Sequence, residues 1–240
     1  MSPSLFSLSG LMLLLFLTRI TAIGQDKISL ESDSNNQFIS HIEIFGGPSL
    51  SNYWGKYKAE DQVVNMSYVF GLGLSHRLKS HFEINAKILL EKKGFKRDYL
   101  YTFYDQNNTP TTTRLVQGNK LDYWTVALSG VYYLGKHEHF YIGLGCSLSK
   151  LQKANTYTEE YNLQGVQISN YYAADNSYND FDYGVITAFG YKIPLWRNII
   201  FNTQLGGNLG VSDIMKSEID HEGPLKLFNV WLTVGVTLKL

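Results

Sequence analysis

The sequence is short of the residue types that mark several common protein classes. It contains one cysteine, Cys146, and five prolines among its 240 residues. A single cysteine cannot form an intramolecular disulfide, and its neighbours Leu144 and Leu148 supply no positive charge that would activate the thiol. Lysine plus arginine balances aspartate plus glutamate at 21 each, and no basic stripe is present. We therefore expect no nucleic acid among the partners of this protein.

Long apolar runs are also scarce, and the one clear run lies near the start of the chain. Residues 11–17 read LMLLLFL, which is too short to cross a membrane as a helix. Residues 22–24 then place small side chains at the two positions that a signal peptidase reads. We expect a signal peptide over residues 1–24, a mature protein that begins at Gln25, and an N-terminal periplasmic segment over residues 25–37. An uncleaved membrane anchor is the alternative.

Tyrosine, phenylalanine and glycine, in contrast, are plentiful, at 17, 13 and 21 residues. With so few prolines, this composition favours a sheet over a helix bundle. The strongest local signal is alternation with period two, over segments close to the ~9–11 residues that cross a bilayer as a tilted strand. In residues 63–75 the odd positions are small or polar and the even positions are apolar. The even positions are Val64, Met66, Tyr68, Phe70, Leu72 and Leu74.

Seven further segments alternate in the same way. Residues 81–91 place Glu83, Asn85 and Lys87 opposite an apolar face. The others lie around residues 42–44, 124–134, 140–148, 181–191, 199–211 and 228–240. A soluble sandwich would turn the apolar face to a second sheet, whereas a membrane barrel would turn it to lipid and the polar face to a narrow lumen. Alternation alone fits both architectures.

The lengths of the connections separate the two architectures. Residues 76–80, 135–139 and 194–198 are short connections between predicted strands. Every other connection is longer: residues 51–62, 94–119, 150–180 and 212–226. Short turns at one end and long loops at the other are typical of outer-membrane barrels. We predict an all-β protein, an eight-stranded antiparallel up-and-down transmembrane β-barrel over residues 38–240, with short periplasmic turns and long extracellular loops. A soluble sandwich or a lipocalin-like barrel is the alternative.

Five stretches of the sequence carry a further pattern: residues 24–25, 45–48, 70–73, 141–145 and 234–240. In these stretches the chain resembles the outer-membrane β-barrel family of Bacteroidota, the porin-family or PorT-like small barrels. The resemblance implies a location in the cell outer membrane. It also implies as partners outer-membrane lipid and lipopolysaccharide, the barrel-insertion machinery, and envelope or secretion proteins.

An eight-stranded barrel has an interior just wide enough for side chains to fill. Charges in such a lumen must pair, because each is costly to bury alone. Lys87 has Glu43 and Glu83 as expected partners, with Asp182 as a further candidate. The predicted lumen polar network consists of Glu43, Glu83, Lys87, Asp182, Lys192 and Gln204. We interpret it as a salt-bridged plug, with a narrow ion path as the alternative.

Candidate catalytic and metal-binding groups are sparse. Residues 137–139 place two histidines two positions apart, and His76 and His81 are expected at the same end, but a solvated polar turn is the simpler interpretation. His221, between Asp220 and Glu222, is a weak candidate for a catalytic dyad. We therefore expect no enzymatic activity, no metal site and no cofactor.

The long connections hold aromatic residues among polar ones, a composition that forms adaptable contact surfaces. The candidates for extracellular contact are Tyr101, Tyr104, Tyr161, Tyr171 and Tyr172. The favoured alternative is that the strands extend above the membrane and these tyrosines form its aromatic rim. We predict a non-enzymatic integral outer-membrane protein with a structural or envelope-interaction role, such as a secretion accessory. A narrow small-solute or ion pore and a surface binding protein are the alternatives.

Overall fold

The computed structural model describes most of the chain after residue 39. The described residues are 40–55, 62–104, 108, 110–135, 138–161, 167–174, 177–216 and 223–240. The predicted signal peptide, the segment 25–37, His137 and His221 lie outside them. Within these ranges, no helix is long and apolar enough to cross a membrane.

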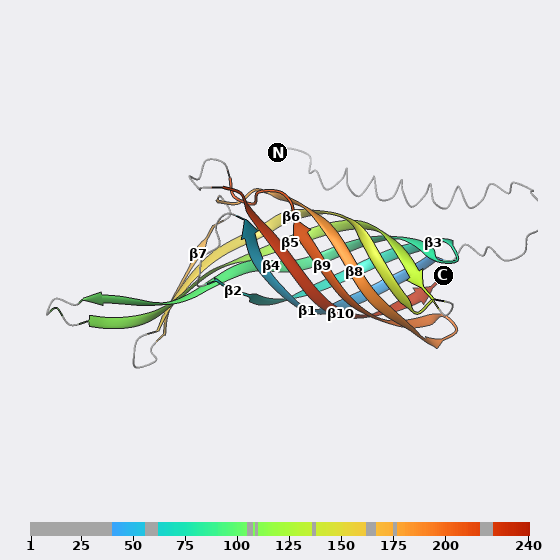
Figure 1. Cartoon of the computed structure of the whole chain (residues 1–240), viewed down its shortest axis with the longest axis horizontal. Coiled ribbons are helices and arrows are strands. Elements are labelled where there is room, and N and C mark those ends of the chain that lie inside the picture. Colours follow the sequence, from blue (N-terminus) through green and yellow to red (C-terminus); the bar gives the residue numbers. More distant parts are fainter. Residues whose placement is uncertain are drawn as a thin grey trace, which may run out of the picture. The chain divides into compact units, whose positions relative to one another are not determined.

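Eight strands form a closed antiparallel ring (Figure 1). They are β1 (Ser40–Gly55), β3 (Asn65–Lys79), β4 (Phe82–Tyr104), β5 (Pro110–Leu134), β6 (Phe140–Tyr161), β8 (Phe181–Trp196), β9 (Ile199–Gly210) and β10 (Leu225–Lys239). Each pairs with the next along the chain, and β1 pairs with β10 to close the ring. Two short strands lie outside the ring: β2 (Gln62–Val63) pairs with β4, and β7 (Gln167–Ala173) pairs with β6. The eight-stranded barrel predicted from the sequence is confirmed.

The two faces of the wall follow the predicted alternation. Successive side chains of a strand point to opposite faces, so each strand has one lumen face and one outer face. On β3, Phe70 and Leu72 are 53% and 56% exposed on the outer face. On β4, Glu83 and Lys87 are buried in the lumen. Ring closure pairs the backbone groups of all strands, which lipid could not satisfy.

The predicted long loops are in large part strand, which corrects their expected boundaries. Residues 94–119 were expected to form a loop, yet β4 and β5 stay paired out to Tyr104 and Pro110. In the same way, β6 continues to Tyr161 and pairs with β7. The physical reason is composition, since tyrosines and threonines at these positions favour strands without requiring a buried face.

The outer face of the barrel can be tested at mid-strand. Leu72 lies in one row with Ile44 and Ile88 on the neighbouring strands, and all three belong to the apolar belt. We expect Leu72→Arg to destabilise the barrel by about 2–4 kcal/mol, because an arginine near the bilayer midplane is poorly solvated. Urea unfolding of the protein in liposomes measures this loss. Leu100→Arg, at an exposed position of the β4 extension, is the matched control and should leave the midpoint unchanged.

Candidate functional site

The lumen is the candidate site, and its first charged cluster lies toward the short turns. Glu83 is fully buried there. The Tyr133 hydroxyl donates a hydrogen bond to Glu83 Oε2 over 2.7 Å, and the Lys192 ammonium lies 3.4 Å from Glu83 Oε1. His41 Nδ1 is 3.8 Å from the same carboxylate. Lys192 also donates to Tyr133, so the cation, the hydroxyl and the carboxylate form one unit.

A second charged cluster lies one layer deeper. Lys87 Nζ is 3.4 Å from Glu43 Oε2 and donates a hydrogen bond to Gln204 Oε1 over 2.8 Å. The Asn202 amide donates to the other oxygen of Glu43. The Tyr141 hydroxyl is 3.0 Å from Asn202 Oδ1 and 3.1 Å from Gln204 Oε1. These groups therefore share partners across β1, β4, β6 and β9.

Gly73 makes the contact between Glu43 and Lys87 possible. The three residues lie in one row, because Gly73 on β3 pairs with Glu43 on β1 and with Lys87 on β4. A Cβ atom at Gly73 would lie 3.3 Å from Glu43 Oε2 and 3.5 Å from Lys87 Cγ. A longer side chain there would occupy the space through which the two charges meet. The ion pair thus spans a strand that contributes no side chain.

An apolar layer separates these clusters from the outer half of the lumen. It consists of Phe45, Val69, Leu89, Ala127, Ile186 and Trp231, all buried. The cavity beside it has a volume of about 20 Å³. A space of that size holds about one water molecule and no larger solute.

A third charged cluster, centred on Lys93, lies beyond the apolar layer. Lys93 Nζ is 3.2 Å from Glu91 Oε2 and 3.7 Å from Asp182 Oδ2. All three side chains are at most 2% exposed. Hydroxyl and amide groups complete the hydrogen bonding of the two carboxylates: Thr125 and Asn229 for Glu91, and Ser212 for Asp182.

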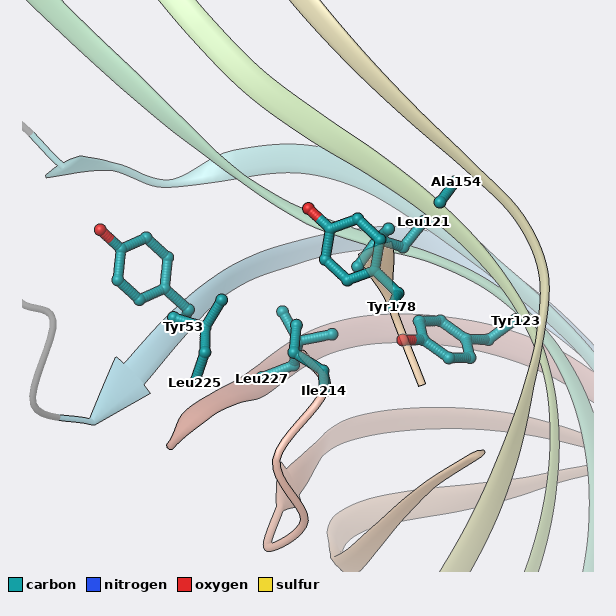
Figure 2. Close-up of a cluster of buried hydrophobic side chains, with 8 residues drawn as sticks. All are labelled: Tyr53, Leu121, Tyr123, Ala154, Tyr178, Ile214, Leu225 and Leu227. Carbon is teal, nitrogen blue, oxygen red and sulfur yellow. The ribbon is translucent and has the colours of Figure 1, made fainter. Parts of the chain in front are cut away.

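The outer end of the lumen is filled by a second apolar cluster, shown in Figure 2. Its members come from β1, β5, β6, β10 and two connecting segments: Tyr53, Leu121, Tyr123, Ala154, Tyr178, Ile214, Leu225 and Leu227. Tyr178 and Met215 form a β-bridge, and Ile214 N donates to Leu225 O over 2.9 Å. The connecting segments thereby fold back onto the end of the barrel.

The opposite mouth, at the short turns, has a polar pocket of about 160 Å³. Arg77 Nη1 lies 2.6 Å from Glu138 Oε2, and His81 Nε2 lies 3.9 Å from Glu138 Oε1. Glu138 thus pairs with Arg77 and lies close to His81, which connects two of the short turns. Within the described residues, no group of three or more His, Cys, Asp or Glu side chains is arranged to hold a metal ion.

The structure places each predicted lumen residue in the interior but divides the network. Glu43, Lys87 and Gln204 meet in one cluster, and Glu83 and Lys192 meet in the next. Asp182, which was a further candidate for Lys87, pairs with Lys93 instead. Glu83, the other expected partner of Lys87, has Lys192 as its ion-pair partner. Sequence reasoning missed three central groups: Lys93, Tyr133 and Tyr141.

The candidate contact tyrosines occupy the strand extensions. Tyr101 and Tyr104 on β4 and Tyr172 on β7 are exposed. Tyr161 is half-buried, and its hydroxyl donates to Glu159 Oε2 over 2.9 Å, which raises the pKa of that hydroxyl. Tyr171 lies on β7, but its side chain is outside the described part of the structure.

An ion pair braces the extension of β4 and β5. Arg114 donates to both oxygens of Asp98, over 2.8 and 2.5 Å. This hydrogen bonding holds the pKa of the Asp98 carboxyl below its ordinary value. The bidentate geometry links the two strands beyond the barrel wall.

A match to a protein-family model agrees with the architecture. The family model for the outer membrane protein beta-barrel domain matches residues 33–216. The chain is similar to Neisserial surface protein A, at 11% identity and a TM-score of 0.44, over 84% of this chain and 97% of that one. It is similar to Ail of Yersinia pestis at 8% identity and a TM-score of 0.38, over 84% of this chain and 99% of that one. It is also similar to OprG of Pseudomonas aeruginosa at 11% identity and a TM-score of 0.35, over 84% of this chain and 95% of that one. No curated protein sequence matches the chain. Since the family match covers well over half of the sequence, the chain belongs to the outer membrane protein beta-barrel domain family and resides in the outer membrane.

Proposed function

We propose that this barrel is a closed, non-enzymatic outer-membrane protein with a structural or envelope-interaction role. The observation that carries the proposal is the filled lumen. Three charged clusters and two apolar clusters follow one another along it, and the cavity beside the central layer measures only about 20 Å³. A lumen packed with side chains stabilises the barrel wall, so we expect the functional surface on the outside of the barrel.

A narrow pore is the competing function, and conductance distinguishes the two. We expect the purified full-length protein in planar bilayers to show little steady conductance, because Phe45, Leu89 and Trp231 are packed in the central layer and the cavity beside them measures about 20 Å³. Single-channel recording at several voltages measures this. Large reproducible channels that persist with independent preparations would contradict the closed barrel.

The lack of enzymatic activity is proposed on the chemistry of the interior. Buried carboxylates in the described lumen are engaged by lysine, asparagine or hydroxyl groups, as Glu43, Glu83 and Glu91 show. These contacts account for the three carboxylates as structural groups of the lumen. The 20 Å³ cavity beside the central layer leaves no room for a substrate at that level of the lumen.

The long β4, β5 and β6 strands support an envelope-interaction role. These strands have 23, 25 and 22 residues, while a tilted strand needs only ~9–11 residues to cross the membrane. The excess length forms a sheet that projects past the ring (Figure 1). Leu100, Tyr101 and Tyr104 are 73%, 56% and 68% exposed on it. Exposed apolar groups of this kind favour contact with another protein. They also support the second candidate function, that of a surface binding protein.

Shortening the extension tests this role. We expect deletion of residues 98–116, with Arg97 and Gln117 joined by Asn-Gly, to leave the barrel folded, because the two-residue turn restores the hairpin at a paired position. Loss of the buried Val116 should lower the urea stability only modestly. Cross-linking of envelope proteins to the barrel in intact cells should be lost. The control keeps the hairpin but replaces the hydrogen-bonded Thr102 and Thr112 with alanine. Undiminished cross-linking of the shortened barrel would contradict the proposal.

The sequence supports proposals on the finer family of this protein, on its export and on its insertion into the membrane. The glycine-rich strands and the closing residues 234–240 support a PorT-like small barrel of Bacteroidota, and with it a secretion accessory role. The apolar run at residues 11–17 supports a signal peptide over residues 1–24, followed by a periplasmic segment over residues 25–37. The barrel-insertion machinery and lipopolysaccharide follow as partners.

A further inference from the structure

The polar pocket at the short-turn mouth of the barrel has more positive than negative charge in its wall. Strands β1, β3, β5, β8, β9 and β10 and the connection before β6 all contribute to it. Its cations are Arg77, Lys192 and Lys239, and the carboxylate of Glu138 also lines it. The volume of about 160 Å³ holds several water molecules or one small group. Outer-membrane barrels turn their short connections to the periplasm, so the pocket opens toward periplasmic solutes.

Only two of the three lining cations are paired within the protein. Lys192 Nζ lies 3.4 Å from Oε1 of Glu83, which is buried beneath the pocket. Arg77 Nη1 lies 2.6 Å from Glu138 Oε2. Lys239, half-buried at the end of β10, has no ion-pair partner among the described side chains. One uncompensated positive charge therefore remains in the pocket.

The surroundings of the pocket add to this positive charge. Lys79 and Arg197 are exposed on the short turns and lie outside the pocket lining. The described side chains at this end of the barrel thus include five cations and two carboxylates: Arg77, Lys79, Lys192, Arg197 and Lys239 against Glu83 and Glu138. A cleft whose wall is mainly of one sign of charge concentrates ions of the opposite sign. The mouth therefore favours an anionic ligand.

Arg77 indicates which anion fits. Its guanidinium carbon lies 4.5 Å from the centroid of the Tyr133 ring, which holds the cation by stacking. Arg77 Nε is buried and has no hydrogen-bond partner among the described residues, so Glu138 leaves part of the donor capacity unused. Arginine binds carboxylates through pairs of N–H groups. Pro194 and Ile200 add apolar surface to the pocket, which suits a carboxylate on a short aliphatic stem.

Glu138 already fills the place of such a carboxylate, and its backbone is strained. Its φ angle is 52°, in the left-handed region that is unfavourable for a residue with a side chain. The Glu138 side chain reaches Arg77 from this conformation. An external carboxylate that replaced Glu138 at Arg77 would allow the turn to relax. The exchange therefore costs less than the loss of an unstrained ion pair.

We propose that the pocket binds a short aliphatic carboxylate, either a free acid or the carboxyl-terminal residue of a peptide. Arg77 and Lys239 are the binding cations, and Glu138 is the internal carboxylate that the ligand displaces. The site lies at the mouth, apart from the apolar layer that fills the centre of the lumen. It therefore does not depend on whether the barrel is closed, and it goes beyond a structural or envelope-interaction role.

Isothermal titration calorimetry of the full-length protein in a nonionic detergent tests the site. The probes are butyrate, the acetylated dialanine peptide with a free carboxyl terminus, and the same peptide with an amidated carboxyl terminus. We expect saturable binding of the two carboxylates and no binding of the amide. Tighter binding of the peptide acid than of butyrate would support the proposal with peptide ends as the ligand source, and the reverse order would support it with free short-chain acids.

Replacing the two binding cations should weaken the affinity for the better carboxylate probe. Arg77→Gln and Lys239→Gln should each weaken it by about tenfold to hundredfold, since a hydrogen bond to a charged group contributes about that much. The matched controls are Lys79→Gln and Arg197→Gln, which remove exposed cations at the same end of the barrel but outside the pocket. Each control should change the affinity by less than about threefold, because solvent and salt screen exposed charges.

A variant of opposite sign separates binding from folding. Glu138→Gln removes the competing carboxylate and should strengthen binding of the carboxylate probe several-fold, which a misfolded protein would not do. Loss confined to the Arg77 and Lys239 variants, together with this gain, supports the proposal. Binding of the amide as tight as that of the acids, equal losses in the control variants, or no gain from Glu138→Gln would each overturn it.

Discussion

Replacing Lys93 with methionine is expected to destabilise the barrel by about 3–5 kcal/mol, because a buried ion-pair partner is removed from one side only. Lys93 is the cation shared by Glu91 and Asp182, and its side chain is 2% exposed. Methionine fills much of the space of the lysine stem but leaves two carboxylates without a counter-charge. The layer between the two apolar clusters would then hold two uncompensated negative charges.

Equilibrium urea unfolding in liposomes measures the loss at Lys93. Lys79→Met, at an exposed position at the end of β3, is the matched control and should be close to neutral. Adding Glu91→Gln and Asp182→Asn to Lys93→Met should recover much of the stability, because the stranded charges are then removed as well. A neutral single variant would show that water reaches this layer and screens the carboxylates.

The barrel itself could be predicted from the sequence because one physical rule governs the whole wall. Each strand must turn an apolar face to lipid and a small or polar face to the lumen, so residues 63–75 alternate between the two kinds of side chain. Glu83 and Lys87 stand out on the lumen face of their strand for the same reason. The short connections all lie at one end of the predicted barrel, and this distinguishes an up-and-down barrel from a sandwich.

The strand extensions could not be predicted, because the rule stops at the membrane boundary. Beyond it, both faces of a strand meet water, so alternation no longer distinguishes a strand from a loop. Residues 99–104 read YLYTFY and carry strand-forming side chains on both faces. Only the pairing of β4 with β5 reveals them as one long hairpin.

Part of the lumen network was also hidden from the sequence. Lys93 continues the inward parity of Glu83 and Lys87, but it lies beyond residue 91, where the predicted strand ended. Tyr133 and Tyr141 sit among the aromatic residues of the outer face, and their inward direction depends on parity along β5 and β6. The pairing of Lys93 with Asp182 joins β4 to β8 across the lumen, which no local pattern encodes.

Lys87→Met is the second replacement with a large expected effect. Glu43 would lose its cation, at a cost of about 3–5 kcal/mol, since the carboxylate stays buried and the neutral Asn202 amide does not balance its charge. The amide oxygen of Gln204 would lose one donor and keep the Tyr141 hydroxyl. The urea midpoint of the barrel in liposomes should fall clearly below that of the unaltered protein.

A double-mutant cycle assigns this loss to one ion pair. Glu43→Gln combined with Lys87→Met should recover much of the stability, because the neutral amide no longer needs a cation. Glu83→Gln combined with Lys87→Met should not, since Glu83 belongs to Lys192 and Tyr133. Rescue by Glu83→Gln instead would mean that the two clusters share one cation and that the row through Gly73 does not define the pair. A neutral Lys87→Met would mean that the lumen is hydrated enough to screen Glu43, and the narrow pore would then become the better account of the barrel.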